Sequence, residues 1–484
     1  MNMEQAVTNV PDFLPALPEI VMALGAMALL MWGVFRKCDA RETGIGAIGL
    51  FVLVAALLVI EPDTAVQAFG GMFVVDVFTK FMKLLILLAA VAAIVMSFGF
   101  IRREKMDRFE FPVLIVLATL GMFMMVSANG LMSLYMGLEL QSLSLYVIAA
   151  IHRDNARATE AGLKYFVLGA LASGMLLYGA SLVYGFTGSV EFSGIAGVLA
   201  TEGTNIGVIF GIVFVLAGLA FKISAVPFHM WTPDVYEGAP TPVTAFFGGA
   251  PKVAAMALIL RVLFGAFPSM EAEWQQIVVF ISIASMVLGA FAAIGQSNIK
   301  RLMAYSSISH MGFALVGLAA GTPEGVRGVL IYLVIYVVMN VGVFCCILAM
   351  QRKEGYVESI SNLAGLSRNQ PMMAFLLAML MFSLAGVPPL AGFFGKFYVF
   401  MAAIEAGLYP LAVIGVLSSV VGAFYYLRIV KIMYFDEPAE PFIQPMPGEL
   451  ATVLGITGVF TMLFFVYPAP LIVGAQAAVG ALLP

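Results

Sequence analysis

Four lysines and one glutamate interrupt apolar stretches in which an ionisable side chain is costly: Lys164, Lys222, Lys252, Lys396 and Glu139. On insertion scales each charged group at the centre of a membrane span costs roughly 2.5–3.5 kcal/mol. Five unpaired groups would cost about 12–18 kcal/mol, as much as the net stability of a typical domain. A chain that keeps them must pair or hydrate them, and the usual reason is that ions or protons move through the protein.

The composition predicts an all-α, polytopic membrane protein. The chain has 484 residues, of which 62% are hydrophobic and 11% charged, and its mean hydropathy is +1.03. Soluble domains are nearer half apolar and a quarter charged. The net charge of −4 gives no electrostatic reason to bind nucleic acid.

The sequence contains few residues or motifs that bind metals or cofactors. The three cysteines and three histidines are too few and too scattered for a metal or iron–sulfur site. The chain also has neither a P-loop nor a Gly-rich dinucleotide loop. We therefore expect no cofactor in this chain and assign any redox chemistry to partner subunits.

A membrane-spanning helix needs about 20 predominantly apolar residues. Applied along the chain, this length predicts fourteen spans: 16–35, 44–61, 74–101, 110–128, 131–151, 160–186, 205–230, 243–266, 275–295, 302–320, 327–350, 371–400, 409–434 and 450–467. The extents of spans 8 and 12 are the hardest to define.

The charges in the connections predict the orientation. Basic residues gather in the connections after spans 1, 3, 5, 9 and 11 and at the end of span 13: Arg36, Lys37, Arg41, Arg102, Arg103, Lys105, Arg108, Arg153, Arg157, Lys300, Arg301, Arg352, Lys353, Arg368, Arg428 and Lys431. The opposite connections carry mostly acids, such as Glu61, Asp63 and Glu271. The positive-inside rule makes the basic side cytoplasmic and places both termini outside.

Two predicted spans contain helix breakers. Span 7 includes Phe221-Lys-Ile-Ser-Ala-Val-Pro227, and span 12 includes Gly386-Val-Pro-Pro-Leu-Ala-Gly-Phe-Phe-Gly-Lys396. Irregular backbone at membrane depth is tolerated only where it is buried in protein or lines water, and paired broken helices point to a transporter's ion site. The segment 229–242 that follows span 7 has three prolines and two acids. It is either a rigid turn or a re-entrant functional loop.

The broken spans 7 and 12 are five apart, so spans 4–8 and 9–13 are candidate five-helix repeats. An odd number of spans requires the second repeat to be inverted in the membrane. We expect four segments: 1–109 with three helices, 110–266 and 267–434 as the two repeats, and 435–484 as a C-terminal helix and tail. Sequence support is weak, since Lys222 precedes its proline whereas Lys396 follows its proline pair.

Several segments together resemble the N-subunit family of the bacterial proton-translocating NADH:quinone oxidoreductase (respiratory complex I), whose members are antiporter-like membrane subunits. The most specific match is Phe221-Lys-Ile-Ser-Ala-Val-Pro-Phe-His-Met-Trp231, continuing to Pro242. The other matching segments are Leu17–Met27, Glu139–Tyr146, Thr159–Ser173, Asn298–His310 and Gly386–Lys396. They extend over all but the ends and some outer loops.

The resemblance implies fourteen spans in two inverted repeats and a proton path through them. Glu139 would pair with Lys222, Lys252 would relay protons toward the centre, and Lys396 would face the far exit. Lys164 and His310 would lie near the same polar axis.

The same resemblance places the chain in the bacterial inner membrane, with its termini on the periplasmic side. Its partners would be antiporter-like sister subunits, small helical subunits and the lipid bilayer. NADH, FMN, iron–sulfur clusters and quinone, such as ubiquinone, would act in the complex outside this chain. The chain would then be a non-redox, H⁺-transporting subunit of the enzyme.

Simpler interpretations stand beside each functional one. Glu139 could be a structural acid, Lys222 and Lys164 could extend to the interface, and His310 could be a satisfied buried histidine. For the whole chain, the alternatives are a subunit of a multisubunit Na⁺/H⁺ antiporter and a structural spacer that conducts nothing.

Overall fold

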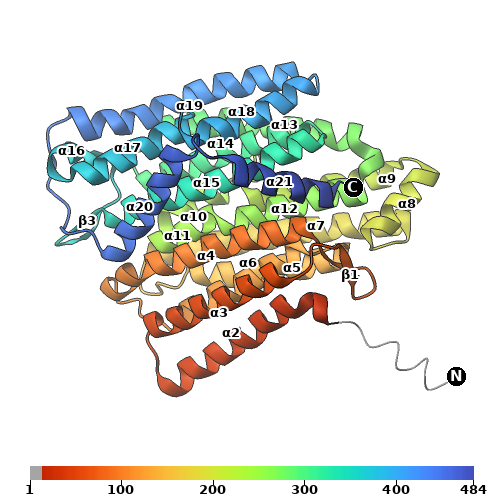
Figure 1. Ribbon diagram of the computed structural model, residues 1–484, viewed down its shortest axis with the longest axis horizontal. Coiled ribbons are helices and arrows are strands. Elements are labelled where there is room, and N and C mark those ends of the chain that lie inside the picture. The colour runs from red at the N-terminus through yellow and green to blue at the C-terminus, as the bar shows by residue number, and fades with distance from the viewer. Residues whose placement is uncertain (1–12, 484) are drawn as a thin grey trace.

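The structure is a computed structural model that describes residues 13–483, and helices make up nearly all of it. The helices lie side by side in one bundle with roughly aligned axes (Figure 1). The start of α2 and the end of α21 lie at the same edge of this bundle (Figure 1). The first twelve residues, which belong to the predicted segment 1–109, lie outside the described residues.

The N-terminal segment contains three long helices and one hairpin. After a 3₁₀ turn (Leu14–Ala16) come α2 (Leu17–Arg36), α3 (Ala40–Ile60), the antiparallel strands β1 (Val66–Ala68) and β2 (Phe73–Val75), and α4 (Val77–Arg103). Polar residues define two of the helix starts. Asp39 caps α3 by accepting the Glu42 amide, and Asp76 forms a capping box with Thr79 at the start of α4.

The first predicted repeat contains eight helices: α5 (Glu110–Val126), α6 (Leu131–Ala149), α7 (Ala156–Thr187), α8 (Phe192–Glu202), α9 (Ile206–Ile223), α10 (Trp231–Gly238), α11 (Thr241–Gly248) and α12 (Ala250–Ala266). Predicted span 7 is broken between α9 and α10. Span 8 is also broken, at Gly249, which the sequence analysis did not predict. The segment 229–242 is not a plain turn, because most of it forms the buried helix α10 and the start of α11.

The rest of the chain follows the same plan. After a 3₁₀ turn (Pro268–Met270), the second predicted repeat has α13 (Glu271–Ile294), α14 (Ile299–Ala319), α15 (Pro323–Ala349), the hairpin β3 (Gln351–Arg352) and β4 (Gly355–Tyr356), a 3₁₀ turn (Ile360–Leu363), α16 (Leu366–Asn369), α17 (Pro371–Ala385), α18 (Ala391–Glu405) and α19 (Tyr409–Phe435). The last helices are α20 (Gly448–Leu463) and α21 (Ala469–Leu482).

Within residues 13–483, eleven helical segments are long and apolar enough to cross a membrane. The remaining three predicted spans correspond to the shorter helix α5, the broken pair α17 and α18, and α20. All fourteen predicted spans are therefore helical. Two helices were not predicted from the sequence: α8, and α21, which follows α20 after Pro468.

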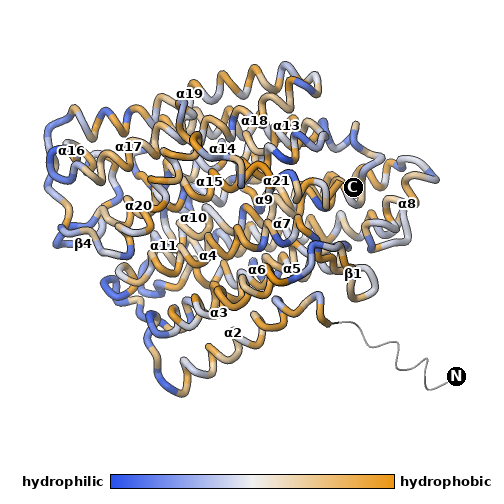
Figure 2. Tube along the Cα trace, in the orientation of Figure 1, coloured by the Kyte–Doolittle hydropathy of each residue, from blue (hydrophilic) through white to orange (hydrophobic). Residues whose placement is uncertain are grey.

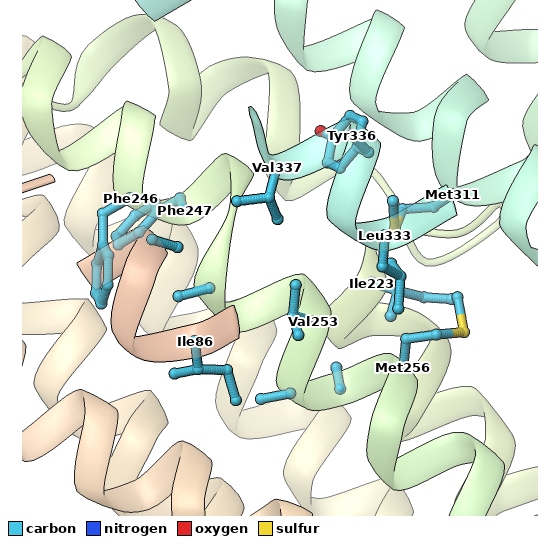
Figure 3. Packing of buried hydrophobic residues seen from close by; sticks show 14 of the residues in the cluster. Ile86, Ile223, Phe246, Phe247, Val253, Met256, Met311, Leu333, Tyr336 and Val337 are labelled. Carbon is cyan, nitrogen blue, oxygen red and sulfur yellow. The ribbon is translucent and has the colours of Figure 1, made fainter. Parts of the chain in front are cut away.

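The centre of the bundle is formed by helices that are buried on nearly all sides, namely α12, α14 and α15. Figure 3 shows their meeting point with α4, α9 and α11, where Ile86, Phe247, Val253, Met311 and Leu333 pack together. Figure 2 shows apolar residues along the middle of the helices and hydrophilic residues gathered near α16, β4 and the α2–α3 connection. The candidate lysines therefore lie within an apolar bundle.

Candidate functional site

The first candidate pair joins α6 and α9. Lys222 is 5% exposed and lies in the last turn of α9, where the helix dipole favours a cation. Its Nζ donates a 2.6 Å hydrogen bond to Ser142 Oγ on α6, and the Ser142 hydroxyl donates to the Leu138 carbonyl. Glu139 lies one turn before Ser142.

The direct contact implied for Glu139 and Lys222 is absent from the described ion pairs. The negative charge of Glu139 acts on the Lys222 ammonium, but Ser142 supplies the hydrogen bond. Glu139 is only half-buried, and its buried Oε1 atom has no protein partner. The carboxylate is thus near Lys222 without being fixed to it.

The break after α9 contains several polar groups without protein partners. Ser224 adopts a left-handed conformation (φ 63°) that ends α9. The Trp231 indole donates to the Phe221 carbonyl, and Ser285 accepts the Val226 amide. In contrast, the buried hydroxyls of Ser224 and Thr232 have no protein partner, and the Tyr236 hydroxyl interacts only with Ser307 among the described residues. Buried hydroxyls of this kind are where internal water binds.

Aromatic rings lie between Lys222 and the next lysine. The Lys222 Nζ is 5.7 Å from the centroid of the Phe221 ring, which packs against Trp231, and Trp231 packs against Tyr236. The Lys252 Nζ is 5.7 Å from the centroid of the Tyr236 ring. The protein contacts between the two ammonium groups are therefore aromatic rather than hydrogen-bonded.

From Lys252 onward, polar contacts continue through α14 and α15. Lys252 is 1% exposed, follows the Gly249 break and donates to Ser307 Oγ, which also accepts the Tyr336 hydroxyl at 2.8 Å. The Tyr336 ring lies 5.3 Å from the His310 ring, measured between centroids. Ser307 and Tyr336 were not predicted from the sequence.

His310 lies at the centre of a hydroxyl network. Its Nδ1 lies 2.6 Å from the Tyr332 hydroxyl, and its Nε2 lies 3.1 Å from the Tyr426 hydroxyl, which also contacts Ser306. All these side chains are buried. The Phe313 ring lies between His310 and Lys396, since it contacts the imidazole and lies 4.7 Å from the Lys396 Nζ.

Lys396 reaches back from α18 to the end of α17. Its Nζ donates to the carbonyls of Leu384 and Ala385, at 3.0 and 2.9 Å, and to Ser419 Oγ at 2.8 Å. These carbonyls are the last two of α17, so the ammonium occupies the negative end of that helix. Lys222 and Lys396 therefore occupy equivalent ends of two half-helices, although their sequence positions do not align.

Lys164 lies apart from the other five residues. Its side chain is 42% exposed and forms 2.8 Å ion pairs with Glu160 and with Asp234 on α10. Asp234 also pairs with Arg301. Burial acts against the ionised form of Asp234, yet hydrogen bonds from Lys164 and Arg301 hold its pKa below the usual range. We call Glu139, Lys222, Lys252, His310 and Lys396 the central file.

Two buried ion pairs escaped the sequence analysis. Lys83 on α4 and Glu19 on α2 lie 2.6 Å apart, and Arg261 on α12 forms two hydrogen bonds with Asp76. The partners are 64 and 185 residues apart, so only the packed structure brings them together. Their shared signal in the sequence is a basic residue inside an apolar span.

Metal ligands do not cluster in the part of the chain that the structure describes. No group of three or more His, Cys, Asp or Glu residues there could hold a metal ion. The central file instead contains amines, one imidazole and one carboxylate, and serine and tyrosine hydroxyls contact them. All of these groups can bind or exchange protons.

Comparison with known proteins places this arrangement in a family. The family described as "NADH:quinone oxidoreductase/Mrp antiporter, TM" matches residues 128–422. NADH-quinone oxidoreductase subunit N from Parvibaculum lavamentivorans is 86% identical over 483 residues and covers 100% of both chains.

Two solved structures share the fold. A chain of respiratory complex I from Thermus thermophilus is 33% identical, with a TM-score of 0.82 over 95% of this chain and 100% of that chain. A chain of the Mrp complex from Dietzia has a TM-score of 0.85, over 98% of both chains. Its identity is only 21%, so it supports the fold alone.

Proposed function

The chain belongs to the family of NADH-quinone oxidoreductase N subunits, and we propose that its central file carries protons across the membrane. The proposal rests on one observation above all. Side-chain contacts link Lys252 through Ser307 and Tyr336 to His310, and from there through Phe313 to Lys396. Groups that donate and accept protons thus follow one another from Lys252 to His310, and the Phe313 ring separates His310 from Lys396.

Within the file, the Lys222 region is where transfer is controlled. A buried ammonium keeps its proton while a carboxylate lies near and releases it more readily when that charge moves away. Glu139 acts on Lys222 without a direct bond, so a small movement of Glu139 or α6 changes this balance. We propose that the redox reaction in partner subunits drives that movement. The proton released by Lys222 then passes to Lys252 once Lys252 has given up its own proton toward Ser307 and His310.

Water completes the segment between Lys222 and Lys252. The unpartnered hydroxyls of Ser224 and Thr232 and the Tyr236 hydroxyl near Ser307 supply polar attachment points beside the aromatic rings that separate the two lysines. A water molecule needs two to four polar partners in a buried site. Wetting of this segment permits transfer, and drying blocks it.

Protons enter from the side of the basic connections, which we assign to the cytoplasm. A pocket of about 560 Å³ on that side is lined by His152, Glu237, Thr241, Lys300 and Glu358 among others. A neighbouring pocket of about 230 Å³ includes Lys164 and Asp234. We assign Lys164 to this entrance. Its ion partner Asp234 lies on α10, two residues before Tyr236, and the Tyr236 ring contacts Lys252. Lys396 faces the exit.

The same proposal covers the setting of the chain. It lies in the bacterial inner membrane with its termini on the periplasmic side, beside antiporter-like sister subunits and small helical subunits. NADH, FMN, iron–sulfur clusters and quinone belong to the wider complex. Residues 110–266 and 267–434 act as two inverted repeats between the segments 1–109 and 435–484. An Mrp-type sodium–proton antiporter is the weaker assignment, since that likeness is one of fold.

The test is Lys222→Ala in the assembled complex, reconstituted in vesicles. NADH:quinone electron transfer and proton uptake into the vesicles are measured together. We expect the rate of proton uptake to fall about ten-fold or more, which corresponds to a barrier increase of at least about 1.4 kcal/mol. Lys431→Ala is the matched control, because Lys431 is an exposed lysine that pairs only with Asp436.

Full pumping by the Lys222→Ala complex would reject Lys222 as an obligatory carrier. Glu139→Gln tests the control step separately, since it keeps the shape of the side chain and removes its charge. An unchanged pumping yield in that variant would remove the switching role of Glu139.

A further inference from the structure

A separate group of buried charges lies in the N-terminal three-helix segment, away from the central file and from Lys164. Glu19 at the start of α2 and Lys83 in the second turn of α4 form a 2.6 Å ion pair. The Lys83 side chain is 0% exposed, and its Nζ lies 5.4 Å from the centroids of both the Phe73 and Phe123 rings. Such a pair is costly to bury, and replacing it by apolar residues is often neutral or stabilising.

A third charged residue adjoins this pair. Glu61 follows the last residue of α3, and α3 packs against both α2 and α4. Both Glu61 carboxyl oxygens are buried and accept no hydrogen bond from the described residues. The charges of Lys83 and Glu19 both act on Glu61. Lys83 is paired with Glu19 and acts on Glu61 through its charge, and a single bound proton makes the group of three neutral.

The surroundings give Glu61 a route to the outside. A pocket of about 320 Å³ lies against it, and the other lining residues include Leu57, Thr64 and Val75. This pocket is at the end of the bundle where the connections carry mostly acidic residues. The Glu19–Lys83 pair is therefore adjacent to a carboxyl that adjoins a pocket.

We propose that Glu19, Lys83 and Glu61 form a proton-exchange site on the acidic-loop side, separate from the central file. One proton is shared between the two carboxylates beside the Lys83 ammonium, and it leaves or enters through the pocket against Glu61. Each exchange moves one proton between a carboxyl oxygen and water, and no other bond changes.

The other charges at this end of the segment do not offer the same chemistry. Lys80 pairs with exposed Asp63 and also donates to the Glu61 backbone carbonyl. Asp76 is fully engaged with Arg261. Burial raises the pKa of Glu61, Glu19 raises it further, and Lys83 and Lys80 oppose the rise. Glu61 is thus a buried carboxyl that holds a proton more readily than an exposed glutamate does.

The test is a pH titration of the intact complex, followed by the infrared band of protonated carboxyl groups. The ordinary pKa of a glutamate side chain is about 4.3. We expect a band that persists above this pH in the wild type and is absent from Glu61→Gln. Glu19→Gln should move this titration to lower pH, whereas Lys83→Met should move it to higher pH. Glu202→Gln, at an exposed carboxyl at the end of α8, is the control and should leave it in place.

Opposite shifts in the Glu19 and Lys83 variants are expected because Glu19 strengthens proton binding at Glu61 and Lys83 weakens it. If Glu61 titrates independently of this ion pair, its titration stays in place in both variants. Identical titrations in wild type, Glu61→Gln, Glu19→Gln and Lys83→Met would overturn the proposal. The measurement uses the resting enzyme, so it does not depend on whether the central file pumps.

Discussion

The two broken spans hold their lysines in different ways. At the first break, the Lys222 ammonium has one hydrogen-bond partner, Ser142, and several hydroxyls nearby have no protein partner. At the second break, the Lys396 ammonium has three partners, two of them backbone carbonyls. Both lysines lie at the carbonyl end of a half-helix, so the helix dipole favours a cation in each case.

This difference separates two roles. A cation bound by backbone carbonyls is fixed in place, because the carbonyls of Leu384 and Ala385 cannot move without unwinding α17. A cation bound by one serine side chain can change partners when Glu139 or water approaches. The first break is therefore the site of control, and the second is a fixed station at the exit.

The largest difference in stability should come from removing each ammonium. Lys396→Met leaves three acceptors without a charged donor, whereas Lys222→Met leaves only Ser142. Each hydrogen bond to a charged group contributes roughly 1.5–3 kcal/mol. We expect Lys396→Met to lower the thermal unfolding temperature of the assembled complex clearly more than Lys222→Met does. Equal losses would remove the distinction between a fixed and a mobile lysine.

The serine partners offer a matched pair of smaller changes. Ser142→Ala removes the hydrogen-bond partner of Lys222, so we expect pumping to fall about ten-fold, equivalent to about 1.4 kcal/mol. Ser419→Ala leaves Lys396 with two carbonyls, and we expect less than about a two-fold change, or about 0.4 kcal/mol. Both variants are compared by proton uptake per NADH. A larger effect at Ser419 than at Ser142 contradicts the assignment.

The hydroxyl of Tyr236 tests the wet segment between the two central lysines. Tyr236→Phe keeps the ring and removes the buried hydroxyl, so we expect slower pumping, by about three-fold, with little change in stability. Tyr178→Phe is the control, since Tyr178 lies on the exposed face of α7. Pumping at the wild-type rate in Tyr236→Phe would show that water does not need this hydroxyl.

The smallest effect concerns Asp234 at the entrance. The folded-state pKa of Asp234 is lowered, so its ion pairs stabilise the protein above the unfolded pKa of about 3.9 and lose that effect as pH falls through the lowered value. Because the group is one-third exposed, we expect Asp234→Asn to cost about 1 kcal/mol or less. Hydrogen exchange of the α10 amides should show a constant difference between about pH 5 and pH 8. A difference that disappears within this range would contradict the lowered pKa.

The sequence was sufficient for the spans and for the helix breaks at Pro227 and at Pro388-Pro389. Runs of apolar residues and helix-breaking prolines are local signals, and the lysines are conspicuous within them. The break at Gly249 was missed because Gly248, Gly249 and Pro251 lie inside one long apolar run, and the length of that run alone predicted a single span. Helix α21 was not predicted because Pro468 and Pro470, at its start, interrupt the apolar pattern.

Tertiary partners were the main limit. The contacts of Lys396 are backbone carbonyls, which every residue possesses, so no sequence pattern marks them. Ser142 was visible only as part of a polar stripe, and its bond to Lys222 depends on how α6 packs near α9. Lys83 was overlooked because its partner Glu19 lies on another helix, 64 residues away.

The most direct test is a density map of the intact complex that resolves water molecules around α9, α10 and α12. We predict ordered water on the hydroxyls of Ser224, Thr232 and Tyr236, forming a hydrogen-bonded connection between the Lys222 and Lys252 ammonium groups. Dry aromatic packing between these two lysines in every functional state of the enzyme would contradict proton transfer through the central file.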